Sequence, residues 1–309
     1  MWIVPDRDAL NLMSEQRVLL VINPKSGKGR AVSLASDLIR YANRAATKCV
    51  VVQPENASEA LNDLVSAISV GRYDALIAIG GDGLVHHAIQ VIAGTELPLY
   101  VVPAGTGNDI ARSNEFMTTS PSAIFDAIYS QEPKEIDTGR IYFANGERKF
   151  CQILSTGFDA QVNERANRTN LVSGRMKYNF AMIGEIQKFK TINYKLEIDG
   201  KCSSVDAMLI AVANAQTYGG GMRLCPMADR RDGLLDIMIL HPVSKPELMK
   251  VFPKVYSGRH VTHPAVEFQR ARNVKITADT VAYADGERIG VLPITVDVVP
   301  KSLRMWTVN

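Results

Sequence analysis

The sequence predicts an α/β protein, in which an N-terminal nucleotide domain on a doubly wound parallel sheet precedes a mostly antiparallel, β-layered domain with helical interludes. Three observations predict this fold. Short apolar runs alternate with amphipathic helical patterns up to about residue 112, a glycine-rich turn follows three of the runs, and short strand-like segments separated by turns make up most of the remainder. This order is typical of parallel strands with helical crossovers, followed by antiparallel layers.

The expected strands of the first domain are four apolar runs, at residues 18–22, 49–52, 75–79 and 97–102. Apolar residues recur at helical spacing over 31–42 and 57–68, which indicates amphipathic helices between the strands. In a doubly wound sheet, ligands bind beyond the carboxyl ends of the strands. All three glycine-rich turns lie at those ends.

The pattern changes after a helical stretch at residues 122–130. The expected strands of the second part include residues 195–198, 207–212, 235–240, 274–278 and 294–299. Helical patterns at 175–189 and 245–256 interrupt them. Residues 131–134 are a candidate hinge, so we expect domains at 1–133 and 134–309, with the last residues free to pack back on the first domain. Two substrates would meet in the cleft between the domains.

Length and charge limit the class of protein. At 309 residues with 46% hydrophobic content, the chain is long enough for two domains, and its net charge of +3 argues against a dedicated nucleic-acid binder. No stretch reaches the roughly 20 apolar residues of a spanning helix, and residues 1–17 lack the features of a signal peptide. We therefore expect a cytoplasmic protein. Residues 164–190 carry six basic and two acidic side chains, which indicates either a solvated face or a contact with the inner face of a membrane.

The three glycine-rich turns predict a site for phosphate and magnesium. They are Asn23–Gly29 (NPKSGKG), Gly80–Gly83 (GGDG) and Pro103–Asp109 (PAGTGND). Glycines let successive backbone N–H groups point at an anion, and a helix N-terminus beyond them adds positive potential. Asp82 and Asp109 supply hard oxygen ligands for a cation that accompanies the phosphates.

Two further acidic turns each allow two interpretations. Asp285 and Glu287 belong to an Asp-Gly turn that by itself indicates a plain hairpin, but beside a phosphate site Asp285 is a candidate base for the hydroxyl of a phosphate acceptor. Asp229 and Asp232, with a main-chain carbonyl at Leu234, form either a surface turn or a structural site for a hard cation.

His86 and His87 are adjacent on a predicted helix. Because adjacent helical side chains diverge, the pair is poorly suited to binding one metal ion, and a polar packing role is favoured.

Taken together, these motifs resemble the diacylglycerol kinase catalytic-domain family of soluble lipid kinases, most closely its actinobacterial type. The resemblance covers residues 23 to about 300. It depends on motifs that occur in family-like order: NPKSGKG at Asn23, GGDG at Gly80, PAGTGNDIAR at Pro103, STGFDA at Ser155, ANAQTYGGGMRLCP at Ala213, DGLLD at Asp232 and ADGE at Ala284.

The resemblance implies the roles of individual residues. The catalytic set would be Asp285 and Glu287 toward the acceptor, with Asp82 and Asp109, and the structural magnesium site would be Asp229, Asp232 and the carbonyl of Leu234. The nucleotide would contact Asn23, Pro24, Lys25, Ser26, Gly27, Gln53, Gly80, Gly81, Asp82, Gly83, Leu84, Val85, His86 and Thr106. Many family members have threonine at the position of Leu84, so that phosphate contact would come from backbone N–H groups or Thr106.

The expected activity is transfer of the γ-phosphoryl group of ATP to the hydroxyl of diacylglycerol, giving phosphatidic acid, with ATP and Mg²⁺ as cofactors. The lipid would be met at the membrane surface, and a homodimer is an option that the sequence leaves open. Three alternatives also stay open: a kinase of another lipid alcohol (sphingoid, ceramide or glycolipid), an NAD kinase, and a regulator that binds nucleotide or lipid without catalysis.

Overall fold

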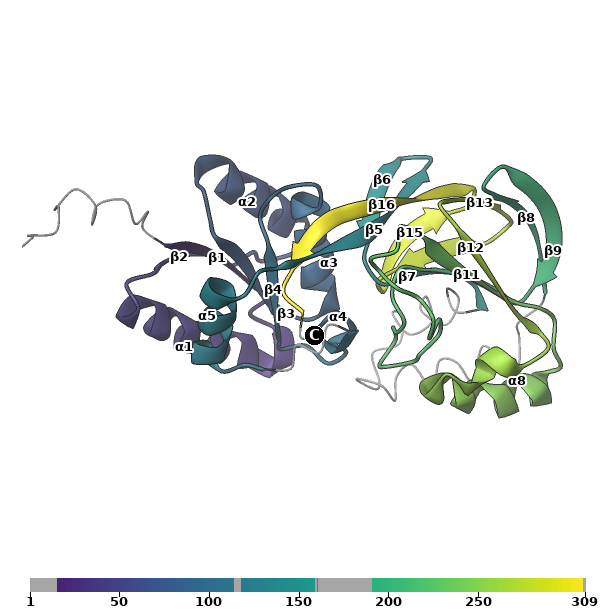
Figure 1. Ribbon diagram of the computed structural model, residues 1–309, viewed down its shortest axis with the longest axis horizontal. Coiled ribbons are helices and arrows are strands. Elements are labelled where there is room, and N and C mark those ends of the chain that lie inside the picture. Colours follow the sequence, from purple (N-terminus) through teal and green to yellow (C-terminus); the bar gives the residue numbers. More distant parts are fainter. Residues whose placement is uncertain (1–15, 114–117, 159, 161–190, 308–309) are drawn as a thin grey trace, which may run out of the picture.

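A computed structural model describes residues 16–113, 118–158, 160 and 191–307. Figure 1 shows two lobes joined by long strands. The first lobe has parallel strands and helices in alternation: β1 (Arg17–Ile22), α1 (Arg30–Arg44), β2 (Lys48–Val52), α2 (Ala57–Val70), β3 (Ala75–Gly80), α3 (Asp82–Ile92), β4 (Leu99–Pro103), α4 (Asp109–Ser113) and α5 (Pro121–Ser130). A short 3-10 turn, η2 (Ser26–Gly29), precedes α1. The doubly wound parallel sheet predicted from the sequence is confirmed, with strand order β2-β1-β3-β4.

The second lobe is mostly antiparallel. Its strands are β5 (Lys134–Phe143), β6 (Gly146–Phe150), β7 (Ile153–Gly157), β8 (Ile192–Ile198), β9 (Lys201–Ala207), β10 (Leu209–Ala213), β11 (Leu235–Leu240), β12 (Val266–Ala271), β13 (Asn273–Thr277), β14 (Val281–Ala284), β15 (Glu287–Val291) and β16 (Ile294–Met305). The described helical segments are α8 (Lys245–Val251), η3 (Phe252–Ser257) and η4 (Arg259–Thr262). The helix predicted at 175–189 lies outside the described residues.

The two lobes share one sheet. This ten-stranded sheet has the order β2-β1-β3-β4-β16-β13-β8-β9, with β5 paired to β16 and β6, and a separate six-stranded sheet has the order β12-β11-β10-β7-β14-β15. β16 pairs with β13 at its start and reaches β4 at its end, where Met305 lies beside Leu99. The last strand therefore extends from the second lobe into the first, as Figure 1 shows.

Hydrophobic pattern explains the elements of the first lobe. Strands β3 and β4 are buried along their whole length because helices cover both faces, as expected of a parallel sheet. Helix α1 buries one face, because its buried residues recur at helical spacing: Ala31, Ala35, Leu38 and Ala42. Asn56 caps the N-terminus of helix α2, where its side chain accepts a hydrogen bond from the Glu59 N–H at 3.0 Å. In the part of the chain that the structure describes, no helix is long and apolar enough to cross a membrane.

Candidate active site

The three glycine-rich turns meet at one edge of the parallel sheet. The N–H groups of Ala104 and Gly105 both donate to the carbonyl of Gly80, at 2.9 and 3.1 Å. A Cβ atom on Gly105 would lie 2.5 Å from the Cα of Gly81, and one on Gly27 would overlap the carbonyl oxygen of Ala104. Glycine is therefore required where these turns touch, since any side chain would push them apart.

An acidic cavity of about 300 Å³ lies between these turns and the hairpin of the second lobe. Four of its lining residues are the carboxylates Asp82, Asp109, Asp285 and Glu287, and no lysine or arginine is among the described residues that line it. The sequence-predicted catalytic residues thus converge, although more than 170 positions separate Asp109 from Asp285. A polyanion such as ATP would need a cation to enter this cavity.

Asp82 is the first residue of α3. Its Oδ1 accepts a hydrogen bond from the Ile110 N–H at 3.0 Å, and its Oδ2 lies 2.8 Å from where a Cβ of Gly107 would be. Burial raises the pKa of Asp82, and the nearby charges of Asp109 and Asp285 raise it further, against the lowering effect of backbone hydrogen bonds. A divalent cation beside Asp82 would oppose this rise in pKa and favour the charged carboxylate.

Asp109 connects the two lobes. Its carboxylate accepts hydrogen bonds from the N–H groups of Gly220 at 2.6 Å and Gly221 at 2.9 Å, and it pairs with Arg112. Both oxygens are already bonded to protein donors, so the structure places Asp109 as the residue that fixes the glycine turn 219–221 against the first lobe.

Asp285 and Glu287 occupy the turn between β14 and β15 in different ways. The Asp285 side chain has no exposed surface, and its two oxygens accept hydrogen bonds from the N–H groups of Cys151 at 3.0 Å and Gln152 at 2.9 Å. Glu287 is exposed, and its Oε1 would lie 3.0 Å from a Cβ on Gly83. Glu287, rather than Asp285, is the carboxylate of this pair that is open to the cleft.

A second cavity of about 360 Å³ adjoins the acidic one, because Gly83 and Glu287 line both. Lys25 is the one lysine or arginine among the described residues of its wall, and Leu84 forms an apolar part of it. The predicted nucleotide contacts divide accordingly. Those that line one of the cavities are Asn23, Lys25, Gly81, Asp82, Gly83, Leu84 and Thr106. Those that lie outside both walls are Pro24, Ser26, Gly27, Gln53, Gly80, Val85 and His86.

Two of these outlying residues have clear structural roles. Val85 belongs to the hydrophobic core of the first lobe. His86 is buried beside Asp285, and its Nδ1 lies 3.4 Å from Asp285 Oδ2. Its Nε2 lies 3.2 Å from the side-chain Nε2 of Gln90. The polar packing role expected for His86 therefore describes its environment better than a nucleotide contact does.

Gln152, which the sequence did not single out, also lines the acidic cavity, as does Tyr218 of the ANAQTYGGGMRLCP motif. Gln152 donates through its side chain to Ser113 at 2.7 Å. Gln152 belongs to no recognisable turn signal, whereas Tyr218 directly precedes the glycines Gly219–Gly221 of that motif.

The turn at Asp229–Leu234 is held by the protein itself. Asp229 accepts from the Arg231 N–H at 3.1 Å, while Asp232 accepts from the Leu234 N–H at 3.0 Å and pairs with Arg270. In the described part of the chain, no three His, Cys, Asp or Glu side chains are grouped to hold a metal ion. A structural magnesium at this turn stays a prediction.

Asp137, which the sequence did not single out, supports the same turn. It is fully buried and accepts from the N–H groups of Gly233 and Lys301, both at 2.8 Å. It thereby joins β5, the acidic turn and β16.

Comparison of the sequence with known protein families identifies the family of this chain. The family model described as the diacylglycerol kinase catalytic domain matches residues 17–141, and the YegS C-terminal NAD kinase beta sandwich-like domain matches residues 152–307. A diacylglycerol kinase from Mycobacterium tuberculosis is 38% identical over 292 residues, which cover 94% of each chain. This chain belongs to the diacylglycerol kinase family. Its membership makes it a kinase, as the sequence predicted.

More distant members of the diacylglycerol kinase family extend the comparison. A diacylglycerol kinase from Staphylococcus saprophyticus is 25% identical over 301 residues, covering 95% of this chain and 96% of its own. The crystal structure of a Bacillus anthracis protein superimposes with a TM-score of 0.75 at 20% identity, covering 96% of this chain and 98% of that one. A second, described as a diacylglycerol kinase from the same organism, gives 0.71 at 18% identity over 96% and 97%. These two structures show a shared fold.

Proposed function

We propose that this member of the diacylglycerol kinase family transfers the γ-phosphoryl group of ATP to the free hydroxyl of diacylglycerol and releases phosphatidic acid. The observation that carries the proposal is the pair of adjoining cavities. The larger, with Lys25 and Leu84 in its wall, suits the nucleotide, and the acidic one suits the reacting phosphate and the acceptor. Gly83 and Glu287, which line both, mark where transfer would occur.

The acidic cavity fits Mg²⁺. It is rich in carboxylates, yet no three of the described ones are grouped as a cage. Mg²⁺ is commonly held by one or two carboxylates together with substrate phosphates and water, which is the set that Asp82 can complete. Bound there, the ion would neutralise charge on the phosphates and polarise the γ-phosphoryl group.

The protein's own residues would position the reactants. Backbone N–H groups of the glycine turns and Lys25 would hold the phosphates, and Asp109 would keep the two lobes together through its bonds to Gly220 and Gly221. Glu287 would accept the proton of the acceptor hydroxyl, because its side chain is exposed beside Gly83. As the hydroxyl oxygen bonds to the γ-phosphorus, the bond from that phosphorus to the β-phosphate oxygen would break and ADP would leave. Asp285 would position Glu287 by anchoring the hairpin to Cys151 and Gln152.

A labelled-ATP assay tests the proposal. The full chain is incubated with γ-labelled ATP and Mg²⁺, and separately with dioleoylglycerol, sphingosine, ceramide and NAD, and each product is identified by mass spectrometry. We expect labelled phosphatidic acid and little label elsewhere. Label mainly on NAD, on a sphingoid or on no acceptor would refute the assignment.

The same assay tests the role of Asp82. Asp82→Asn keeps an oxygen for the Ile110 N–H but removes the charge, so turnover should fall by about 100-fold or more. The matched control is Asp279→Asn, an exposed carboxylate outside the cavities, which should keep wild-type turnover.

A further inference from the structure

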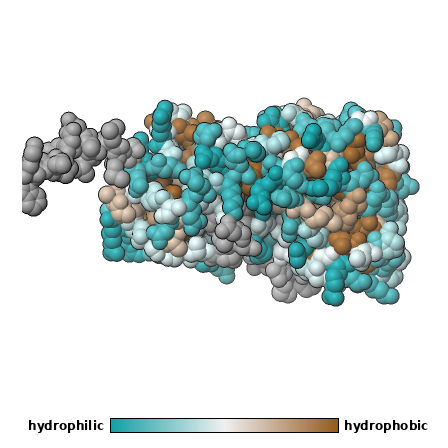
Figure 2. Space-filling model, viewed as in Figure 1, coloured by the Kyte–Doolittle hydropathy of each residue, from teal (hydrophilic) through white to brown (hydrophobic). Residues whose placement is uncertain are grey.

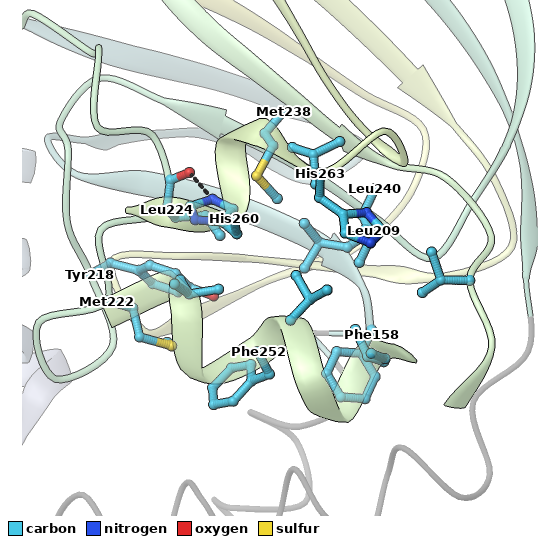
Figure 3. Close-up of a pocket in the computed structure, with 15 residues that line it drawn as sticks. Phe158, Leu209, Tyr218, Met222, Leu224, Met238, Leu240, Phe252, His260 and His263 are labelled. Carbon is cyan, nitrogen blue, oxygen red and sulfur yellow. Dashed lines mark hydrogen bonds between the residues drawn. The ribbon is translucent and has the colours of Figure 1, made fainter. Parts of the chain in front are cut away.

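A separate apolar cavity lies within the second lobe. Its floor is formed by Leu209 on β10 and by Met238 and Leu240 on β11, and its cover by Phe252 and Val255 of η3. Figure 3 shows Leu209, Met238 and Phe252 around a common space between the strands and the helical segments. The cavity volume is about 60 Å³.

Tyr218 connects this cavity with the acidic one, because it lines both. Its position is fixed: its N–H donates to the carbonyl of Met222 at 3.0 Å, and the Met222 N–H donates back at 2.9 Å. Gly220 and Gly221, two and three positions after Tyr218, donate hydrogen bonds to Asp109. The wall between the two cavities therefore belongs to the turn that joins the lobes.

Two histidines in the wall of the apolar cavity each have one ring nitrogen engaged by the protein, while the Nδ1 of His260 is buried without a hydrogen-bond partner in the described part of the chain. The Nε2 of His260 lies 2.9 Å from the carbonyl of Leu224, and the Nε2 of His263 lies 3.2 Å from Glu247. Burial lowers the pKa of His260, so this imidazole is neutral at pH 7. Most of the other wall residues are aliphatic, aromatic or methionine side chains, so the cavity suits an apolar group.

We propose that this cavity receives an acyl chain of the lipid substrate, which passes Tyr218 while the lipid hydroxyl stays in the acidic cavity. This inference rests on the proposed function and adds to it the place where the acyl chain binds. A lipid alcohol needs a charged site for its hydroxyl and an apolar site for its tail, and two such cavities share one residue here.

The small volume determines the manner of binding. It is well below the roughly 300 Å³ of a typical ligand pocket, so a long chain enters only as the covering segment moves outward. Met222 and Met238 line the cavity, and methionine adapts its shape more readily than branched side chains do. The cover is itself partly apolar outside: Met249 of α8 is 54% exposed, and Figure 2 shows apolar side chains on this lobe.

The experiment narrows the cavity by mutation and varies the length of the acyl chains of the lipid substrate. Val266→Phe adds a ring from β12, and Val251→Phe adds one from α8 on the opposite wall, so one variant carries the test if the other does not fold. Val70→Phe, at an exposed position of the first lobe, is the matched control. For each folded protein, kcat/KM is measured with dioleoylglycerol and with the short-chain dibutyrylglycerol.

We expect Val266→Phe and Val251→Phe to lower kcat/KM for dioleoylglycerol by about tenfold or more and for dibutyrylglycerol by less than about twofold, with the KM for ATP unchanged. Equal losses on both lipids, or no loss on either, would overturn the acyl-chain assignment while the kinase assignment stands. Absence of phosphorylation of both lipids by the wild-type chain would instead refute the proposed function itself.

Discussion

Asp285 and Glu287 stand two residues apart on one hairpin, yet their environments are opposite. Asp285 adopts a left-handed backbone conformation (φ 51°) with a fully buried carboxylate, whereas Glu287 is exposed between the two cavities. A residue that takes a proton from a substrate must come within hydrogen-bond reach of it. At the residue scale, this difference supports the proposal that Glu287 takes the proton and that Asp285 positions the hairpin.

The two assignments predict different defects. Glu287→Gln should lower kcat by about 100-fold or more with an unchanged melting temperature, because only the proton acceptor is lost. Asp285→Asn should lower the stability by about 1–3 kcal/mol, because its new amide group must face a main-chain N–H that now has no acceptor. Steady-state kinetics and thermal unfolding of both variants are the measurements. Full turnover in Glu287→Gln would return the role of base to Asp285.

The identity of the acidic residues was predictable from sequence, but their environments were not. Asp82, Asp109, Asp285 and Glu287 were each recognised because a glycine lies beside them or one position removed in a turn-forming motif. The burial of Asp285 depends on N–H donors at Cys151 and Gln152, more than 130 positions away. No local pattern reports such a contact.

At the scale of elements, the glycine turns after β3 and β4 are packed backbone to backbone. Gly105→Ala should destabilise the protein by about 1–3 kcal/mol and raise the KM for ATP, since a Cβ there lies 2.5 Å from the Cα of Gly81. Gly71→Ala serves as control, because its Cβ meets only the ring tip of Tyr73. Chemical unfolding and ATP kinetics test both; equal stability of the two variants would contradict the contact.

The short element η4 gives the second lobe a sensitivity to acid. Burial lowers the pKa of His260 from 6.5, whereas the unfolded chain binds a proton at its ordinary pKa. The stability that neutral His260 contributes is thus fully present above pH 6.5 and is lost as the pH falls through the folded-state value. His260→Gln should lose less stability than wild type between pH 7 and pH 5.

Urea unfolding at both pH values measures this effect. His241→Gln, which removes a part-exposed histidine of the same lobe, is the control. Parallel losses of stability in wild type and His260→Gln would show that His260 does not contribute.

Element positions followed from periodicity in the first lobe, where the predicted strand at 18–22 is observed as Arg17–Ile22. The single helical pattern predicted at 245–256 is observed as α8 ending at Val251 and the 3-10 segment η3. Pro253 explains the difference, because it cannot donate the N–H that a continuing α-helix requires. Apolar spacing alone does not distinguish these two outcomes.

At the scale of the whole molecule, β16 makes one sheet out of two lobes. The start of β16 pairs with β13, and its end pairs with β4. Strand β5 pairs with β16 along most of its length. The sequence predicted a strand at 294–299 but not its continuation to Met305, because polar Lys301 and Ser302 and a Pro interrupt the apolar alternation. The pairing with β4 joins residues about 200 positions apart, which only the tertiary fold specifies.

Trp306, directly after β16, anchors this strand in the first lobe. Trp306 is 3% exposed, and the centroid of its ring lies 6.0 Å from that of Tyr100. Its Nε1–H donates a hydrogen bond to the Gln131 carbonyl at 2.9 Å. Trp306→Ala should therefore cost about 3–5 kcal/mol. Trp306→Phe keeps the ring contact and loses chiefly the hydrogen bond, at about 1 kcal/mol.

The two variants together test whether β16 couples the lobes. Urea unfolding measures the free energies, and hydrogen exchange at the edge of β4 reports the local pairing. If the end of β16 stabilises the first lobe, Trp306→Ala should increase hydrogen exchange in both β4 and β5, because both strands pair with β16. Strands β10 and β11 belong to the separate sheet and should stay protected. Faster exchange spread evenly over both sheets would mean that the molecule unfolds as one unit and that Trp306 stabilises it only globally.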